Sequence, residues 1–190
     1  MVRWEPGAQV RLQVAALDLY ASRGFEQTTA ADIAQSVGLT ERTFFRHFAD
    51  KREVLFAGQE HFQQVFVDGV AAAPEEASAL DAVAHALQAA SSFFPDDRRA
   101  HSRQRQQIIT ANPGLHEREL LKMAWLSAGI AEALRRRGVP EPQATLAAET
   151  GVTVFSVAYR QWLADGEERS LAAIEVEVLG EVRALSASVR

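Results

Sequence analysis

One stretch of this chain, residues 25–52, constrains the fold more than any other, and it reads FEQTTAADIAQSVGLTERTFFRHFADKR. Thr29 is a favourable N-cap for a short helix over about residues 30–35, and Thr40 is a favourable N-cap for a second short helix. Gly38 lies between them, where the chain must reverse and a positive φ is needed. Two short helices joined by a tight glycine turn are typical of the unit that places one helix in a DNA major groove.

The second of these helices is expected to have one buried side and one free flank. Phe44 and Phe48 are four residues apart and therefore share a face, which we expect to be buried. The side chains left on the other faces belong to Glu41, Arg42, Thr43, Phe45 and Arg46. An ordinary helical hairpin inside an all-α domain is the alternative, because glycine turns between short helices are common.

Composition excludes several classes of protein. Of the 190 residues 47% are apolar, which predicts a globular fold, and the absence of cysteine excludes disulfide scaffolds, thiolate metal sites and cysteine nucleophiles. No apolar run reaches the roughly 20 residues that span a bilayer, so we expect a soluble, cytoplasmic protein. The chain lacks GxSxG, phosphate-cradling glycine loops and HExxH, and its five histidines are scattered. We therefore expect no enzyme, no metal and no cofactor.

The net charge of −5 argues against a general nucleic-acid coat, but its distribution is uneven. Residues 1–52 have a balance of +1, whereas residues 53–190 have a balance of −6. Within the candidate DNA-binding unit, four cations cluster, and they are Arg42, Arg46, Lys51 and Arg52. Such a protein would hold DNA through a small local patch, doubled by dimerisation.

Hydrophobic periodicity predicts helices throughout and no strands. The expected helices before and after the short pair cover residues 8–23, 51–73, 77–93, 97–111, 115–137, 141–163 and 167–188. The fold class is therefore all-α. We expect a three-helix, homeodomain-like helix-turn-helix domain over residues 1–52, continuing into the first part of helix 51–73, and a larger helical bundle over residues 53–190.

The last two helices have more apolar surface than one bundle face needs, which suits a four-helix interface between two subunits. The candidate interface residues are Leu146, Val154, Val157, Leu171, Ile174, Val178 and Val182. A bundle packed entirely within one chain is the alternative.

Aromatic residues at helical spacing are candidates for the wall of an apolar ligand pocket, although most such residues form plain core. The candidates are Phe62, Phe66, Phe94, Trp125, Phe155 and Tyr159, with His101 and Arg105 as polar groups. The basic run over residues 98–106 is either a solvated face or a contact for an anionic ligand, such as the phosphates of an acyl-coenzyme A.

The segment FEQTTAADIAQSVGLTERTFFRHFADKREVL resembles the N-terminal domain of the TetR family of transcriptional regulators. The matching residues are Phe25, Thr28, Thr29, Asp32, Ile33, Ala34, Val37, Gly38, Leu39, Thr43, Phe44, Phe45, His47, Phe48 and Lys51. The C-terminal two thirds resembles the family in layout only, and the resemblance implies that residues 53–190 form a ligand-binding and dimerisation domain. The resemblance implies a homodimer on double-stranded DNA, most often a repressor released from a palindromic operator by a small, apolar effector. A helical ligand-binding or scaffolding protein that does not bind DNA is the alternative.

The same resemblance implies roles for individual residues. Thr29 would contact a phosphate or the groove, and Lys51 would reach a phosphate. The residues nearest the bases would be Glu41, Arg42 and Thr43, and those facing the groove wall and backbone would be Phe45, Arg46 and His47. The chain departs from the family at Arg42, where a small residue is common, and at Phe45, where tyrosine is usual. Arg42 would contact either guanine O6 and N7 or a phosphate.

Overall fold

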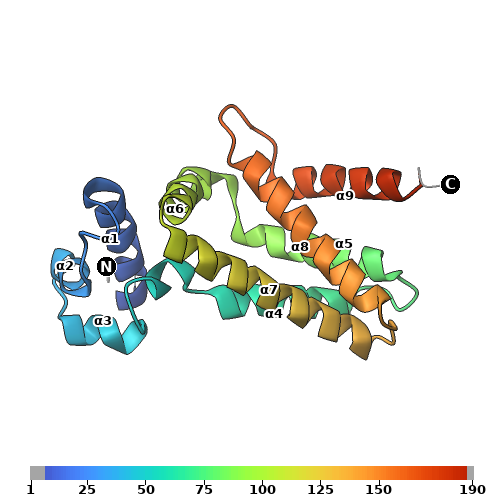
Figure 1. The fold of residues 1–190 in the computed structure, drawn as a ribbon, viewed down its shortest axis with the longest axis horizontal. Coiled ribbons are helices and arrows are strands. Elements are labelled where there is room, and N and C mark those ends of the chain that lie inside the picture. The colour runs from blue at the N-terminus through green and yellow to red at the C-terminus, as the bar shows by residue number, and fades with distance from the viewer. Residues whose placement is uncertain (1–6, 188–190) are drawn as a thin grey trace, which may run out of the picture. The chain divides into compact units, whose positions relative to one another are not determined.

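The computed structural model describes residues 7–187, and every regular element in that range is helical (Figure 1). The elements are α1 (Ala8–Arg23), α2 (Ala30–Ser36), α3 (Glu41–His47), η1 (Glu53–Phe56), α4 (Gln59–Ala72), α5 (Ala79–Ala90), η2 (Ser91–Phe93), η3 (Asp96–Arg98), α6 (Arg99–Ala111), α7 (Pro113–Arg136), α8 (Gln143–Trp162) and α9 (Leu171–Ala187), where η marks a 3-10 helix. The expected all-α class is confirmed. In the described range no helix is long and apolar enough to cross a membrane. The expected last helical residue, Ser188, lies outside the described residues.

Packing divides the chain into two units that are not contiguous in sequence. The N-terminal unit contains the residues up to Gly58 together with Arg103–Glu119, and the C-terminal unit contains Gln59–Ser102 and the residues from Leu120 onward. Helices α6 and α7 therefore each carry residues of both units. The assignment of residues 53–190 to ligand binding and dimerisation stays a prediction.

The core of the N-terminal unit draws on both of its chain segments. Ile33 of α2 and Phe44 of α3 are completely buried in it, and so is Ile109 near the end of α6. Leu115, in the first turn of α7, is 1% exposed in the same core. The corner between α6 and α7 is thus an integral part of the unit that carries the helix-turn-helix.

The expected single helix over residues 51–73 was wrong. The chain forms η1 first, and α4 begins only at Gln59, after Gly58 adopts φ +87°. Three consecutive side chains of η1 are buried, and they are Val54, Leu55 and Phe56. All three belong to the core of the N-terminal unit. The positive φ of Gly58 lies outside the helical region, so the chain leaves the helical conformation there before α4 begins.

The bundle of the C-terminal unit depends on small residues where helices cross. A Cβ atom on Gly69 of α4 would lie 2.7 Å from the Cα atom of Ala86 in α5, and the His85 Nδ1 is 3.0 Å from the Gly69 carbonyl oxygen. Helix α9 runs antiparallel to α5, because Gln88 donates to the carbonyl of Ala172 while residues 81 and 183 form an ion pair further along. Close backbone approach at Gly69 sets how tightly α4 and α5 pack.

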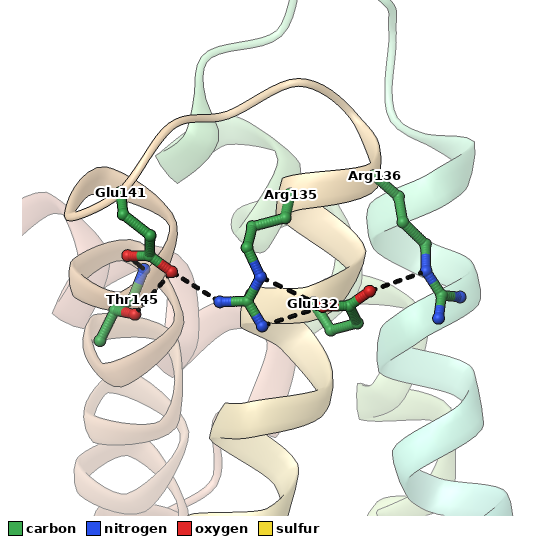
Figure 2. Close-up of polar contacts among 5 residues, drawn as sticks. All are labelled: Glu132, Arg135, Arg136, Glu141 and Thr145. Carbon is green, nitrogen blue, oxygen red and sulfur yellow. Dashed lines mark hydrogen bonds and ion pairs between the residues drawn. The ribbon is translucent and has the colours of Figure 1, made fainter.

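The turn between α7 and α8 is held by an exposed network of charges (Figure 2). Arg135 pairs with Glu132 at 3.0 Å and with Glu141 at 2.6 Å, and the Thr145 hydroxyl donates to Glu141 at 3.1 Å. Arg136 also pairs with Glu132, at 3.2 Å. Because solvent reaches all of these groups, we expect the network to fix the geometry of the turn while adding little to stability.

The next residue, Arg137, caps a different helix. Its guanidinium donates to the carbonyl oxygen of Ala73 at 2.8 Å and to that of Pro74, directly after α4 ends. The last carbonyls of a helix lack partners within the helix and carry a partial negative charge, so a guanidinium is favourable there. Arg137 therefore ties the end of α7 to the end of α4.

One carboxyl group is buried in this unit without a partner. The Glu175 side chain is 1% exposed, and neither of its carboxylate oxygens has a hydrogen-bond partner among the described groups. It lies on the face of α9 that also contains the buried Leu171, Ile174 and Leu179. Burial raises the pKa of Glu175 to about 8, because an apolar environment disfavours the charged form.

Gly69→Ala should destabilise the protein by about 1–3 kcal/mol, because the new methyl group overpacks the crossing of α4 and α5. The sign is informative, since helix propensity alone would favour alanine by about 1 kcal/mol. Urea denaturation followed by circular dichroism measures the difference. Gly114→Ala in α7 is the matched control, because nothing lies within 4 Å of its Cβ position. Equal stability of the two variants would contradict the close crossing.

Stability should fall as the pH rises from about 5 to 8, because the folded state keeps a proton on Glu175 that the unfolded chain releases above the ordinary pKa of 4.5. Glutamine does not titrate, so the free energy of unfolding of Glu175→Gln should fall by about 3–5 kcal/mol less than that of the wild type over this pH range. Denaturation midpoints at pH 5, 6.5 and 8 provide the measurement. Parallel pH profiles for the two proteins would show that Glu175 does not titrate in this way.

Candidate nucleic-acid interface and ligand core

The start of α2 is fixed by a reciprocal cap. The Asp32 amide donates to the Thr29 hydroxyl oxygen at 3.1 Å, while the Thr29 amide and hydroxyl donate to the Asp32 carboxylate at 2.8 and 2.6 Å. These hydrogen bonds from Thr29 hold the pKa of Asp32 below its ordinary value. The arrangement is a capping box, and it presents the exposed Thr29 at the positive end of the α2 dipole.

The turn between α2 and α3 has the geometry that glycine allows. Gly38 has φ +70°, its amide donates to Gln35 at 3.0 Å, and the Leu39 amide donates to the carbonyl of Ala34 at 2.8 Å. Arg11 of α1 donates to the carbonyl of Val37 in the same turn. These bonds satisfy the last carbonyls of α2 and fix the direction in which α3 begins.

Helix α3 is anchored by two phenylalanines and leaves its opposite flank free. Phe44 is 0% and Phe48 4% exposed, and their ring centroids are 5.4 Å apart. Arg42 and Arg46 are exposed on the side directly opposite, and within residues 7–187 neither forms an ion pair or a hydrogen bond through its side chain. Phe45 is 52% exposed beside them. The flank therefore offers two guanidinium groups and an aromatic ring to a partner.

The remaining predicted residues of α3 are less accessible. Glu41 is exposed in the first turn, whereas Thr43 is half-buried and its hydroxyl oxygen lies 3.0 Å from that of Thr40, the N-cap. His47 is also half-buried, and its Nε2 has no hydrogen-bond partner among the described groups. A role for His47 in filling the end of the helix is consistent with this burial.

Lys51 has an internal role that the sequence did not predict. Its ammonium group donates to the carbonyls of Phe25 at 2.8 Å, Thr28 at 3.1 Å and Glu26 at 3.3 Å, and it lies 4.3 Å from the centroid of the Phe25 ring. The Tyr20 hydroxyl donates to the Lys51 carbonyl at 2.6 Å. Lys51 thus holds the connection between α1 and α2, and a phosphate contact, which stays a prediction, would compete with these bonds.

Arg52, the fourth cation of the expected patch, is paired within its own turn. The Asp50 carboxylate lies 2.7 Å from the Arg52 guanidinium and also accepts hydrogen bonds from the amides of Arg52 and Glu53. This pairing raises the pKa of Arg52. Of the four cations of the expected patch, Arg42 and Arg46 of α3 are thus the two whose side chains form no hydrogen bond or ion pair within residues 7–187.

The corner between α6 and α7 supports η1, and sequence reasoning missed it. Arg105 donates to the Leu55 carbonyl at 2.7 Å, lies 5.3 Å from the Phe56 ring centroid, and forms an ion pair with Glu119 at 3.5 Å. Because Arg105 is engaged in the N-terminal unit, its expected place among the pocket aromatics is corrected. The adjacent Ile108 and Ile109, which are buried although most of their helix is polar, were the sequence feature that could have indicated this corner.

The C-terminal unit gathers most of the predicted pocket residues into an aromatic core. This core consists of Phe62, Phe66, Phe93, Phe94, Phe155, Tyr159 and Trp162. Phe62 lies 5.6 Å from Phe94 and 5.4 Å from Phe155, measured between ring centroids, and Phe155 stacks on Tyr159 at 5.6 Å. Adjacent rings at these distances fill the space between the helices that carry them.

Two other predicted pocket residues are not enclosed in this core. Trp125 is 48% exposed on α7, and His101 is exposed on α6, so a place for them in the wall of an apolar pocket stays a prediction. Among residues 7–187 no group of three or more histidine, aspartate or glutamate side chains is placed to hold a metal ion.

The predicted dimer interface also needs correction. Val154 is 0%, Leu171 1% and Ile174 0% exposed, because these side chains pack in the core of their own unit. Leu146 is 62% exposed. The other predicted residues, Val157, Val178 and Val182, are half-buried. Val176, at 62% exposure, is an accessible apolar residue of α9 outside the predicted interface set.

Two family models match this chain. The model described as bacterial regulatory proteins, tetR family, matches residues 12–57, and the model of the MftR C-terminal domain matches residues 77–185. Together they cover the helix-turn-helix and most of the bundle.

Individual proteins are also similar to this chain. The HTH-type transcriptional regulator TcmR of Streptomyces glaucescens is 36% identical over 74 residues, which span 39% of this chain and only 33% of that relative. The putative mycofactocin biosynthesis transcriptional regulator MftR of Mycobacterium tuberculosis is 28% identical over 156 residues, 79% of this chain and 77% of the relative. The structure of FadR from Thermus thermophilus, a TetR family transcriptional repressor in complex with lauroyl-CoA, superposes with a TM-score of 0.54 at 20% identity and covers 92% of this chain and 93% of that chain.

Proposed function

The chain belongs to the TetR family and is a DNA-binding transcriptional regulator, and we propose that it is a homodimeric repressor released from a palindromic operator by a small molecule. Regulators of this family bind DNA, act as dimers and bind small-molecule effectors. They are generally not enzymes, and we assign this chain no catalytic step. Its proposed place of action is the cytoplasm, where the DNA is.

One observation carries the DNA-binding proposal: the flank of α3 opposite Phe44 and Phe48 faces away from its own unit. A helix of this kind fits the major groove, with its exposed side chains at the base edges. Arg42 and Arg46 are the cations of this flank, and neither is neutralised by a carboxylate of the described chain.

We assign roles to the residues of the flank according to their chemistry. Arg42 has the planar pair of donors that suits guanine O6 and N7. Arg46 and Thr29 would bind the phosphate backbone, with Thr29 at the start of α2. Phe45 cannot donate a hydrogen bond and would contact a thymine methyl group. Glu41 would accept from cytosine N4 or orient a neighbouring arginine.

The proposed dimer interface is the accessible side of α8 and α9. Leu146 and Val176 are its exposed anchors, and Val157 of α8 is half-buried. Val178 and Val182 are half-buried as well, but they pack against the core of their own unit, on the side of α9 away from Val176. Gly180 lies on the exposed side of α9 with nothing within 4 Å of its Cβ position, so a second helix could approach closely there. A two-fold axis through this surface would let the two subunits present both of their α3 helices to one DNA duplex.

The proposed effector site is the aromatic core. Its rings contact one another closely, so a ligand would have to displace some of them, and the half-buried Phe93 and Phe94 are the most accessible. The FadR neighbour binds an acyl-coenzyme A. In this chain Arg99 and Arg105, two cations of the basic run, are used in internal hydrogen bonds. We therefore favour an uncharged, apolar effector over an anionic one.

Selection of bound sequences from a random DNA pool tests this function directly. The expected consensus has two-fold symmetry, with half-sites about one helical turn apart, since each subunit presents one α3. A consensus without symmetry, or no enrichment at all, would contradict a dimeric operator-binding protein.

Arg42→Ala should lose the base preference at one position of each half-site, because a bidentate contact to guanine is worth about 1–3 kcal/mol of discrimination. Repeating the selection with the variant measures this. If the consensus stays the same while affinity falls uniformly, Arg42 contacts a phosphate instead.

Val176→Asp should dissociate the dimer, because a buried unpaired carboxylate opposes association at the centre of an apolar interface. Sedimentation velocity at micromolar concentration gives the oligomeric state. Val10→Asp on α1 is the matched control, since this valine is 50% exposed and lies outside the proposed interface. A dimer that survives the α9 substitution would rule out this face.

A further inference from the structure

A single carboxylate oxygen joins two side chains at the start of α6. Oδ1 of Asp96, in η3, accepts a hydrogen bond from the Trp162 indole N–H at 3.0 Å and forms an ion pair with the Arg99 guanidinium at 2.5 Å. These hydrogen bonds, first that of Trp162 and then that of Arg99, hold the pKa of Asp96 below its ordinary value. We call Asp96, Arg99 and Trp162 the Asp96 latch.

The same guanidinium holds the connection between α8 and α9. Arg99 donates to the carbonyl of Arg169 at 2.6 Å and to that of Glu167, and its side chain is only 12% exposed. Arg169 is in turn bound by the carboxylates of Glu167, at 2.6 Å, and of Glu177 in α9. The first residue of α6 is thus bonded to the segment that leads into α9.

Trp162 belongs to both the latch and the aromatic core. Its ring is completely buried, stacks on Tyr159 at 5.8 Å, and lies 6.1 Å from Phe94 and 5.1 Å from the Arg99 guanidinium carbon. A ligand that displaces Phe94 or Tyr159 therefore disturbs a neighbour of Trp162. Rotation of Trp162 would break its bond to Asp96 and leave a buried N–H without an acceptor.

We propose that the Asp96 latch transmits a rearrangement of the aromatic core to the first turn of α6 and to the α8–α9 connection. This inference rests on the proposed function, in which the core receives an effector and the ligand-free protein binds DNA. In this scheme the latched state is the DNA-binding state, and movement of Trp162 removes one of the two donors that orient Asp96, which weakens the hold of Asp96 on Arg99. Helix α6 continues to Arg105 and Ile109 in the unit that carries α3, so a shift of its first turn reaches that unit through the helix itself.

The coupling follows from the shared acceptor. Trp162 and Arg99 orient the Asp96 carboxylate together. If either donor is lost, the carboxylate is held less firmly, and its bond to the other donor weakens. Removing both donors should therefore lower operator affinity little more than removing one, whereas two independent contacts would give additive losses of binding free energy. Trp162, Arg99 and Asp96 are positioning residues in this scheme, since none of them touches DNA.

Trp162→Phe, Arg99→Gln and the double variant test the latch in the full-length dimer. Each single variant should weaken binding to the selected operator about fivefold or more, the lower range of measured allosteric couplings, and the double variant should be no weaker than the weaker single. Amide hydrogen exchange should speed up together in residues 99–103 and 163–170 in both single variants.

Arg137→Gln is the matched control, because Arg137 also donates to main-chain carbonyls in the same unit but does not contact the latch. It should lower the melting temperature while leaving operator affinity within twofold. Unchanged operator affinity in the latch variants, additive losses, or exchange that speeds up only beside the substitution would overturn the proposal. If the wild type binds no specific DNA, the proposed function fails, and hydrogen exchange alone decides whether the latch couples the two segments.

Discussion

Burial of Phe44 and Phe48 is the constraint on which the DNA-binding unit depends. A helix of seven residues is too short to be stable alone, so its orientation must come from the core into which these two rings pack. The core is completed by side chains distant in sequence, including Ile109 and Leu115. Because the rings fix the rotation of α3 about its own axis, they also determine that Arg42 and Arg46 point away from the protein. The proposed recognition by α3 and the folding of its unit therefore depend on the same pair of side chains.

Arginines serve different purposes in this chain. Several of them, including Arg99, Arg105 and Arg137, donate to main-chain carbonyls and connect segments that are distant in sequence. A guanidinium suits this task because its donors are arranged in a rigid fork and it stays charged at any physiological pH. The arginines of α3 have no such partners among the described residues. A contact with DNA can therefore form without first breaking a bond inside the protein.

Local features of the fold could be predicted from the sequence, and long-range ones could not. Helix α1 covers the expected residues 8–23, and Thr29 and Thr40 cap the helices they were expected to cap, because caps and helical periodicity depend on neighbouring residues. The break before α4 and the three carbonyl bonds of Lys51 depend on contacts with distant segments. Periodicity showed that Val154 and Ile174 lie on apolar faces but not what covers those faces. The contacts of α3 with DNA remain predictions.

The split composition of the N-terminal unit has a consequence for protein engineering. The two family models leave residues 58–76 between them, which suggests that the DNA-binding domain and the C-terminal domain could be separated there. A chimera joined there would receive its α6–α7 corner from the other parent. That corner supplies the buried Ile109 and Leu115 and the Arg105 guanidinium that donates to the Leu55 carbonyl. A corner from another protein would have to fill the same space in the core with side chains of similar shape. When C-terminal domains are exchanged between such regulators, residues 103–119 should therefore stay with the DNA-binding domain.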